Sequence, residues 1–153
     1  MSIFQSLHTS ASALTTQRLR MDVISSNMAN VDTTRARMVN DEWQPYRRKV
    51  VNLQPQEAGF SSFLGAAVGK SGTGSAGQGV RVSRIQEDTE TPFKPVFDPE
   101  HPDANEQGYV SMPNVDPLRE MVDLMSATRS YEANITVLNA NKSMLMKTLE
   151  IGK

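Results

Sequence analysis

Apolar residues recur at helical spacing near the beginning of the chain. Over residues 3–30 neither proline nor glycine interrupts the pattern, and four apolar residues are each seven positions apart: Leu7, Leu14, Met21 and Met28. A repeat of seven is typical of the narrow seam of a coiled coil, whereas a globular helix has a broader apolar face. The pattern therefore predicts a long N-terminal helix, within a segment that spans residues 1–32.

A second helical pattern occupies the other end of the chain. Asp116 followed by Pro117 is a strong start signal, because aspartate caps a helix and proline suits its first position. No further proline or glycine occurs before Gly152. Seam positions alternate three and four apart: Met121, Leu124, Thr128, Tyr131, Ile135, Leu138, Lys142, Leu145 and Leu149. The sequence predicts a second long helix, within a segment that spans residues 114–153.

The stretch between the helices, residues 33–113, has a different character. Residues 46–53 and 79–86 resemble short strands, the second by its alternation of polar and apolar side chains. Residues 59–79 are rich in glycine and serine and predict a flexible loop. Prolines make residues 92–113 extended or turning. We expect a mainly α fold with a small β insert, in which the terminal helices form a discontinuous two-helix coiled-coil domain.

Composition suggests that this domain does not bury all its apolar surface by itself. Of 153 residues 38% are hydrophobic and 6% aromatic, which predicts a thin core completed by neighbouring molecules. The net charge of −1 gives no electrostatic reason to expect nucleic acid or an anionic membrane as a partner. The sequence has neither cysteine nor a run of ~18 apolar residues. The N-terminal pattern also differs from a signal peptide.

Candidate chemical sites are weak. Residues 65–71, Gly-Ala-Ala-Val-Gly-Lys-Ser, have three residues between the glycines, where a phosphate-binding loop needs four. Residues 98–103 group three carboxylates with His101 between prolines, which favours a solvated acidic turn over a metal site. His8 and His101 are the only histidines, and neither belongs to a catalytic constellation. We therefore expect no catalytic residue, metal, cofactor or small-molecule substrate, although an enzyme that degrades cell wall through His101 is one alternative.

Two polar groups invite an interpretation as interaction residues. A basic patch comprises Arg35, Arg37, Arg47, Arg48 and Lys49. We expect it to pair with an acidic run, Glu87, Asp88 and Glu90, of another subunit. Five asparagines lie in or beside the predicted helices: Asn27, Asn30, Asn134, Asn139 and Asn141. Each either fixes the register of a helix pair from a buried position or faces solvent.

Several of these segments resemble one family. Residues 26–34, Ser-Asn-Met-Ala-Asn-Val-Asp-Thr-Thr, resemble the signature that follows the N-terminal helix in flagellar rod and hook proteins, and segments within residues 114–149 are similar to its C-terminal helix. Segments 43–48, 97–103 and 108–110 are similar to the short proximal rod members. Residues 65–79 match no family feature. The motif residues are Asn27, Ala29, Asn30, Thr33, Tyr131, Ala133 and Asn134.

The resemblance implies a structural subunit of the bacterial flagellar rod that polymerises helically through its terminal helices and transmits torque. It implies a periplasmic location, export through the flagellar type III apparatus without a cleaved signal peptide, and three sets of neighbours: copies of itself, other rod proteins, and the membrane-ring and rod-adaptor proteins at the base. Subunit packing would involve Leu7, Leu14, Met21, Met28, Leu124, Tyr131, Ile135, Leu138 and Leu145. Another axial or adaptor protein of a type III system is the alternative. Since long helices are marginal alone, we also expect both ends to be largely disordered in the isolated monomer.

Overall fold

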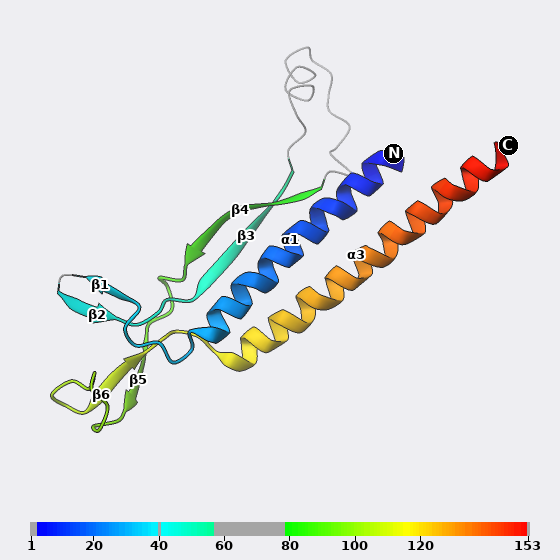
Figure 1. The fold of residues 1–153 in the computed structure, drawn as a ribbon. Helices are drawn as coiled ribbons and strands as arrows, with labels where there is room; N and C mark the ends of the chain where they lie inside the picture. The colour runs from blue at the N-terminus through cyan, green and yellow to red at the C-terminus, as the bar shows by residue number, and fades with distance from the viewer. Residues whose placement is uncertain (1–2, 40, 57–78, 153) are drawn as a thin grey trace, which may run out of the picture. The chain divides into compact units, whose positions relative to one another are not determined.

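Two long helices begin and end the part of the chain that the computed structural model describes, which is residues 3–39, 41–56 and 79–152 (Figure 1). Helix α1 is Ile3–Ala29 and helix α3 is Pro117–Ile151. The backbone N–H of Leu118 donates to Oδ1 of Asp116 across 3.1 Å, so aspartate caps α3. Both predicted helices and the predicted cap are confirmed.

Six strands form three two-stranded sheets in the described residues. Strand β1 (Arg37–Val39) pairs antiparallel with β2 (Glu42–Gln44), and β3 (Lys49–Pro55) pairs with β4 (Val80–Glu87). The strands predicted at 46–53 and 79–86 are therefore confirmed as β3 and β4, with small shifts. Of the predicted flexible stretch 59–79, all but Gly79 lies outside the described residues, as do residues 65–71.

The third sheet shows more regular structure in residues 92–113 than the sequence indicated. Strand β5 (Lys94–Phe97) pairs antiparallel with β6 (Tyr109–Met112), where the prolines predicted an extended or turning segment. Pro95 lies within β5, where it is tolerated because both strands of a two-stranded sheet are edge strands. The fold is thus helical at its ends, as expected, but it contains more strand than predicted.

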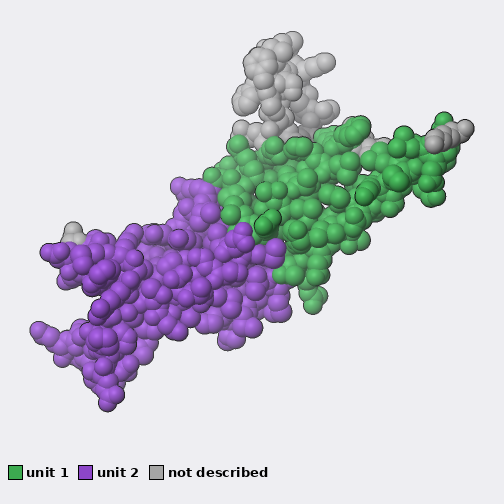
Figure 2. Space-filling view, viewed as in Figure 1, with its two compact units in different colours: residues 1–19, 53–83, 127–153 green, residues 20–52, 84–126 purple. Residues whose placement is uncertain are grey.

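The chain divides into two compact units, coloured separately in Figure 2. Unit 1 contains residues 1–19, 53–83 and 127–153, and unit 2 contains residues 20–52 and 84–126. Each helix, and the β3–β4 pair, contributes residues to both units. The domain boundaries proposed from sequence at residues 32 and 113 stay a prediction.

In unit 2 the end of α1 packs against the start of α3. Arg20 Nη2 lies 3.1 Å from Oδ1 of Asp123, and Asn27 Nδ2 donates to Oε2 of Glu120 across 3.1 Å. The buried apolar residues of unit 2, among those described, are Val23, Ile24, Tyr46, Val110 and Val115. The two helices therefore pack against each other here, and a regular coiled coil along them is a proposal.

In unit 1 the middle of α1 lies against the start of β4. The backbone N–H of Val80 donates to Ser12 Oγ across 3.1 Å, and Thr16 Oγ1 donates to the Val80 carbonyl across 3.3 Å. A Cβ placed on Gly79 would lie 2.3 Å from Ser12 Oγ. Glycine and small hydroxyl side chains thus permit a close approach of strand to helix.

The inward face of α3 includes residues that the predicted seam did not contain. Leu7, Leu14, Met21, Met28, Leu124, Tyr131, Leu138 and Leu145 are all half-buried. Ile135, in contrast, is 37% exposed, and Met121 is exposed too, whereas Glu120 and Ala127 are fully buried. The seam therefore includes positions one residue earlier than predicted. Whether Ile135 packs against another subunit stays a prediction. Among the described residues, neither helix has the length and apolarity of a membrane-spanning helix.

Candidate functional site

Asn27, near the end of α1, uses the whole hydrogen-bonding capacity of its side chain. Its Nδ2 donates to the Lys49 carbonyl across 2.9 Å and to Oε2 of Glu120 across 3.1 Å. Its Oδ1 accepts the Lys49 backbone N–H across 2.9 Å and the Tyr46 hydroxyl across 3.0 Å. A carboxamide has two donors and two acceptor sites, so none is left over. Asn27 is 1% exposed and joins α1 to β3 and α3.

Glu120, in the first turn of α3, places a carboxylate in the interior. The side chain has no exposed surface, and Arg48 Nε donates to its Oε1 across 2.5 Å. With Asn27 on Oε2, both carboxylate oxygens are occupied. Arg48 also reaches Oδ2 of Asp123 at 3.4 Å. A buried carboxylate without such partners would be costly, so Glu120 and Arg48 depend on each other.

Asn114 connects the same region to the lead-in of α3. Its Oδ1 accepts the Arg48 backbone N–H across 2.8 Å, and its Nδ2 donates to the carbonyls of Asp88 and Thr91, each across 3.1 Å. We call the set Asn27, Tyr46, Arg48, Asn114 and Glu120 the polar junction. All five residues belong to unit 2, and they fasten α1, β3 and α3 at one place.

The turn after β4, bound by Asn114, is itself ordered by a carboxylate. Asp88 accepts the Thr91 backbone N–H and the Glu90 backbone N–H, each across 3.1 Å, and the Thr91 hydroxyl across 2.9 Å. Hydrogen bonding from the Thr91 N–H, more than any other contact, lowers the pKa of Asp88. The ionised carboxylate therefore stabilises this turn.

The asparagines and motif residues predicted from sequence divide into two groups. Asn27 is buried and fixes α1 against β3 and α3. Asn30 and Asn134 instead donate to carbonyls of their own helices, at Ser26 and Ser130, each across 2.8 Å. Thr33 supplies the carbonyl that accepts the Tyr46 N–H across 3.0 Å. The remaining positions follow: Tyr131 and Asn141 are half-buried, while Ala29, Ala133 and Asn139 are exposed.

The predicted basic patch finds its acidic partners within the chain. Arg37 Nη1 lies 3.2 Å from Oε2 of Glu87, so an acidic residue of the predicted run is the partner, but it belongs to the same subunit. Arg35 pairs with Asp103 at 2.5 Å, and Arg48 pairs with Glu120. Two cations pack on aromatic rings instead, Arg47 at 4.7 Å from the Phe93 centroid and Lys49 at 5.7 Å from the Tyr46 centroid.

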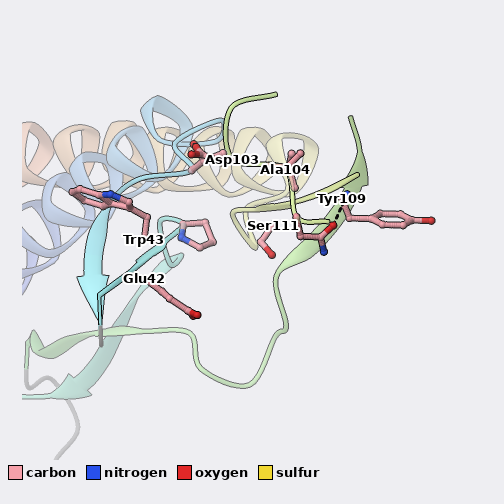
Figure 3. Close-up of a pocket in the computed structure, with 10 residues that line it drawn as sticks. Glu42, Trp43, Asp103, Ala104, Tyr109 and Ser111 are labelled. Carbon is pink, nitrogen blue, oxygen red and sulfur yellow. Dashed lines mark hydrogen bonds between the residues drawn. The ribbon is translucent and has the colours of Figure 1, made fainter. Parts of the chain in front are cut away.

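A groove of about 410 Å³ lies between the two antiparallel hairpins of unit 2. Figure 3 shows Glu42 and Trp43, from β2, across from Asp103 and Ala104, which belong to the loop between β5 and β6. Tyr109 lies at the far end, and its ring contacts Phe97 edge to face, with centroids 5.3 Å apart. Trp43 is the only tryptophan of the chain, and it is 52% exposed.

His101, the histidine considered as a catalytic base, lies two residues before Asp103 in the loop between β5 and β6, and the contacts of its Nδ1 do not suit that role. His101 Nδ1 accepts the Asp103 backbone N–H across 3.1 Å, which places the ring proton on Nε2. The Asp103 carboxylate is 3.9 Å from Nδ1 and is instead engaged by Arg35 and Thr34. In the described part of the chain, no three His, Asp or Glu side chains lie close enough to hold a metal ion.

Sequence reasoning missed the central role of Glu120. Its only signal is its position four residues before the seam residue Leu124, which places it on the inward face of α3. From sequence, Arg48 belonged to a basic patch, and Tyr46 belonged to a predicted strand and to the family-like segment 43–48. Their pairing across more than 70 residues of sequence leaves no local pattern.

Comparisons with known proteins agree on one group of proteins. Residues 7–37 match the family model described as flagella basal body rod protein, and residues 106–151 match the flagellar basal body rod FlgEFG protein C-terminal model. The chain is 63% identical over 153 residues to the flagellar basal-body rod protein FlgC of Bacillus subtilis, with 100% of both chains covered. It is 42% identical to FlgC of Borreliella burgdorferi, covering 99% of this chain and 98% of that one, and 44% identical to FlgC of Escherichia coli O6:H1, covering 93% and 92%.

Proposed function

Since the chain belongs to the FlgC family of flagellar basal-body rod proteins, we propose that its polar junction is the rigid joint through which the terminal helices carry load in the rod. The protein is a structural subunit of the flagellar basal-body rod and not an enzyme. This assignment replaces two alternatives that the sequence left open, which are another axial or adaptor protein of a type III system and an enzyme that degrades cell wall. A structural subunit of a rotating rod acts through stiffness, so its function depends on how its elements are held together.

The proposal rests on one observation. The Asn27 side chain, in which every donor and acceptor makes a hydrogen bond, joins α1, β3 and α3 at a single point. A buried hydrogen-bond network with every group satisfied fixes one geometry, because any relative movement leaves polar groups unpaired in the interior. The Glu120–Arg48 ion pair strengthens this effect. Because the joint does not bend, torque applied to the helices would be transmitted fully to the β-containing insert, residues 33–113.

Assembly proceeds by a contact that repeats without closing, which generates a helical array. The exposed apolar residues of α3, including Ile135, Val137, Met144 and Leu149, supply surface for neighbouring helices. The neighbours are copies of this chain and other rod proteins, with membrane-ring and rod-adaptor proteins at the base. The chain reaches the periplasm through the flagellar type III apparatus, without a cleaved signal peptide.

The same reasoning limits which residues we expect to be disordered in the isolated monomer. The polar junction holds the facing ends of both helices, and Ser12 and Thr16 bind β4, so these parts are folded in the monomer. We expect residues 3–11 and 128–148 to gain order on assembly. Amide exchange of the purified monomer should be fast in those two ranges and slower around Asn27 and Glu120. Slow exchange along the whole of α3 would contradict this expectation.

The experiment that tests the function is deletion of the gene followed by electron microscopy of isolated basal bodies. We expect rings without a complete rod and no swimming, with both restored by the intact gene. Leu138→Pro should fail to restore them because it breaks α3, whereas the matched control Leu138→Met should succeed because it conserves volume. Complete rods and normal swimming in the deletion strain would reject the proposed function.

A further inference from the structure

The two hairpins beside the groove expose large apolar side chains, of which Trp43 and Tyr109 line the groove itself. Trp43 and Met38 extend from the β1–β2 hairpin, and Val96, Phe97 and Tyr109 extend from the β5–β6 hairpin. We call these five residues, with Glu42, the tip surface. Exposed aromatic residues that gather in one place more often indicate a contact site than a surface that faces only water.

The tip surface carries a negative charge without compensation. Glu42 lines the groove, is exposed and makes no ion pair in the described part of the chain. In the loop between β5 and β6, Glu100 and Glu106 are also exposed and make no ion pair among the described residues. Asp103 differs, since Arg35 and Thr34 already occupy its carboxylate. The groove therefore has one satisfied carboxylate on one side and the uncompensated Glu42 on the other (Figure 3). A partner that supplies a cation flanked by apolar side chains would complement it.

The start of α3 has such a cation with apolar side chains beside it. Leu118 is 75% exposed and Val122 is 61% exposed, and with Met125 they lie at i, i+4 and i+7 on one helix face. Arg119 is exposed beside them and has no ion pair in the described residues. Arg119 does not line the groove of its own chain.

We propose that the start of α3 from one copy docks on the tip surface of a second copy, with the Arg119 guanidinium in the groove beside Glu42 and Trp43. Arginine suits this position because its fork binds a carboxylate and its plane packs on an aromatic ring. Both complementary surfaces belong to one chain but are formed by different residues. The contact is therefore heterologous and extends from copy to copy. This inference rests on the proposed rod function and specifies its interface.

The absence of cysteine from the sequence permits a direct test by disulfide crosslinking. Ser111 lines the groove and Val122 lies on the docking face of α3. Basal bodies would be isolated from cells that produce Ser111→Cys and Val122→Cys chains together, oxidised, and analysed on non-reducing gels. We expect a disulfide-linked dimer. Val137→Cys, which is also exposed on α3, replaces Val122→Cys in the matched control and should give none.

Charge reversal provides a second readout in the same preparation. With the cysteines present, Arg119→Glu in the Val122→Cys copy should lower the dimer yield by about tenfold, as for the loss of an arginine at the centre of an interface. Glu42→Arg in the Ser111→Cys copy should do the same, and the two reversals together should restore the dimer. Glu132→Arg, on an exposed part of α3, should leave the yield unchanged.

Failure of this inference is distinguishable from failure of the rod function. If the chain is absent from purified basal bodies, the proposed function is wrong. If the chain is present but the Ser111–Val122 crosslink does not form, or if Ser111→Cys links to a different rod protein instead, the pairing of copies through the tip surface is wrong and the rod function stands. An equal dimer yield from Val122→Cys alone would also overturn the inference, because it would indicate a symmetric contact.

Discussion

Arg48 Nε donates to Oε1 of Glu120 across 2.5 Å, and this pair joins the start of β3 to the first turn of α3 in the interior of unit 2. The arginine side chain is 14% exposed and the glutamate side chain is fully buried. Removal of one partner from such a pair leaves the other charge desolvated and uncompensated. The pair is therefore costly to break, whatever its net contribution relative to an apolar replacement.

Glu120→Ala should lower the free energy of unfolding by about 3 kcal/mol, the lower part of the range for a broken buried pair, because Arg48 keeps its contact with Asp123. Urea denaturation of the purified chain, followed by circular dichroism, measures the change. Glu132→Ala is the control, since Glu132 is exposed on the same helix and should change stability by less than about 0.5 kcal/mol. If Glu120→Ala lowers the free energy of unfolding by less than about 1 kcal/mol, the polar junction rearranges to compensate for the missing carboxylate.

Asn27→Ala should destabilise the chain by about 2 kcal/mol or more. It leaves the Lys49 N–H, the Lys49 carbonyl and the Tyr46 hydroxyl without their partner, and each unsatisfied buried group costs on the order of 1–3 kcal/mol. The control is Asn134→Ala, because among the described residues the Asn134 side chain bonds only to the Ser130 carbonyl of its own helix. Equal effects of the two substitutions in urea denaturation would argue that Asn27 acts only through local helix structure. In swimming assays, Asn27→Ala should also reduce motility more than Asn134→Ala.

Local signals predicted the elements of this fold because they depend on neighbouring residues. The Asp116–Pro117 start of α3 and the uninterrupted helical pattern before Asn30 gave the helix bounds almost to the residue. The β5–β6 hairpin was not specified because the prolines of residues 92–113 predicted only an extended or turning segment. Pro95 is acceptable within β5 because both strands of a two-stranded sheet are edge strands.

The polar junction was less predictable, for a physical reason. Asn27 could be singled out as a helix asparagine, but its partners depend on which backbone groups tertiary structure brings to it. Glu120 looked like an ordinary acidic residue of a first helical turn, which usually faces water. The inward face of α3 also includes the fully buried Glu120 and Ala127, which the apolar pattern could not indicate, whereas Met121 of the predicted seam is exposed in the single chain.

Gly79→Ala should destabilise the chain by about 1–3 kcal/mol, because the added Cβ would overlap Ser12 Oγ. Ser12 cannot simply turn away, since its Oγ accepts the Val80 backbone N–H. Gly152→Ala is the matched control, with only ordinary contacts around its Cβ. If the overlap is the cause, Ser12→Ala combined with Gly79→Ala should destabilise by less than the sum of the single changes. Additive effects in urea denaturation would contradict this explanation.

The Asp103 carboxylate is expected to titrate below its ordinary range, with Arg35 as the main cause. The Arg35 side chain donates to it, and this hydrogen bond lowers the pKa of Asp103, with a further contribution from the Thr34 hydroxyl. The folded-state pKa therefore lies below the unfolded value of about 3.9. The associated stability is fully present above about pH 3.9 and is lost as the pH falls through the lowered pKa.

Carbon-detected NMR titration of the aspartate carboxyl groups measures this effect directly. Arg35→Gln should raise the pKa of Asp103 toward the ordinary value, leaving the smaller contributions of the Thr34 hydroxyl and of His101. Asp88 is the internal control, because its lowered pKa comes chiefly from the Thr91 backbone N–H and should not change in that variant. An unchanged Asp103 titration in Arg35→Gln would mean that the ion pair is not formed in solution. The loop between β5 and β6 would then be held against residues 34–35 by the Thr34 hydroxyl alone.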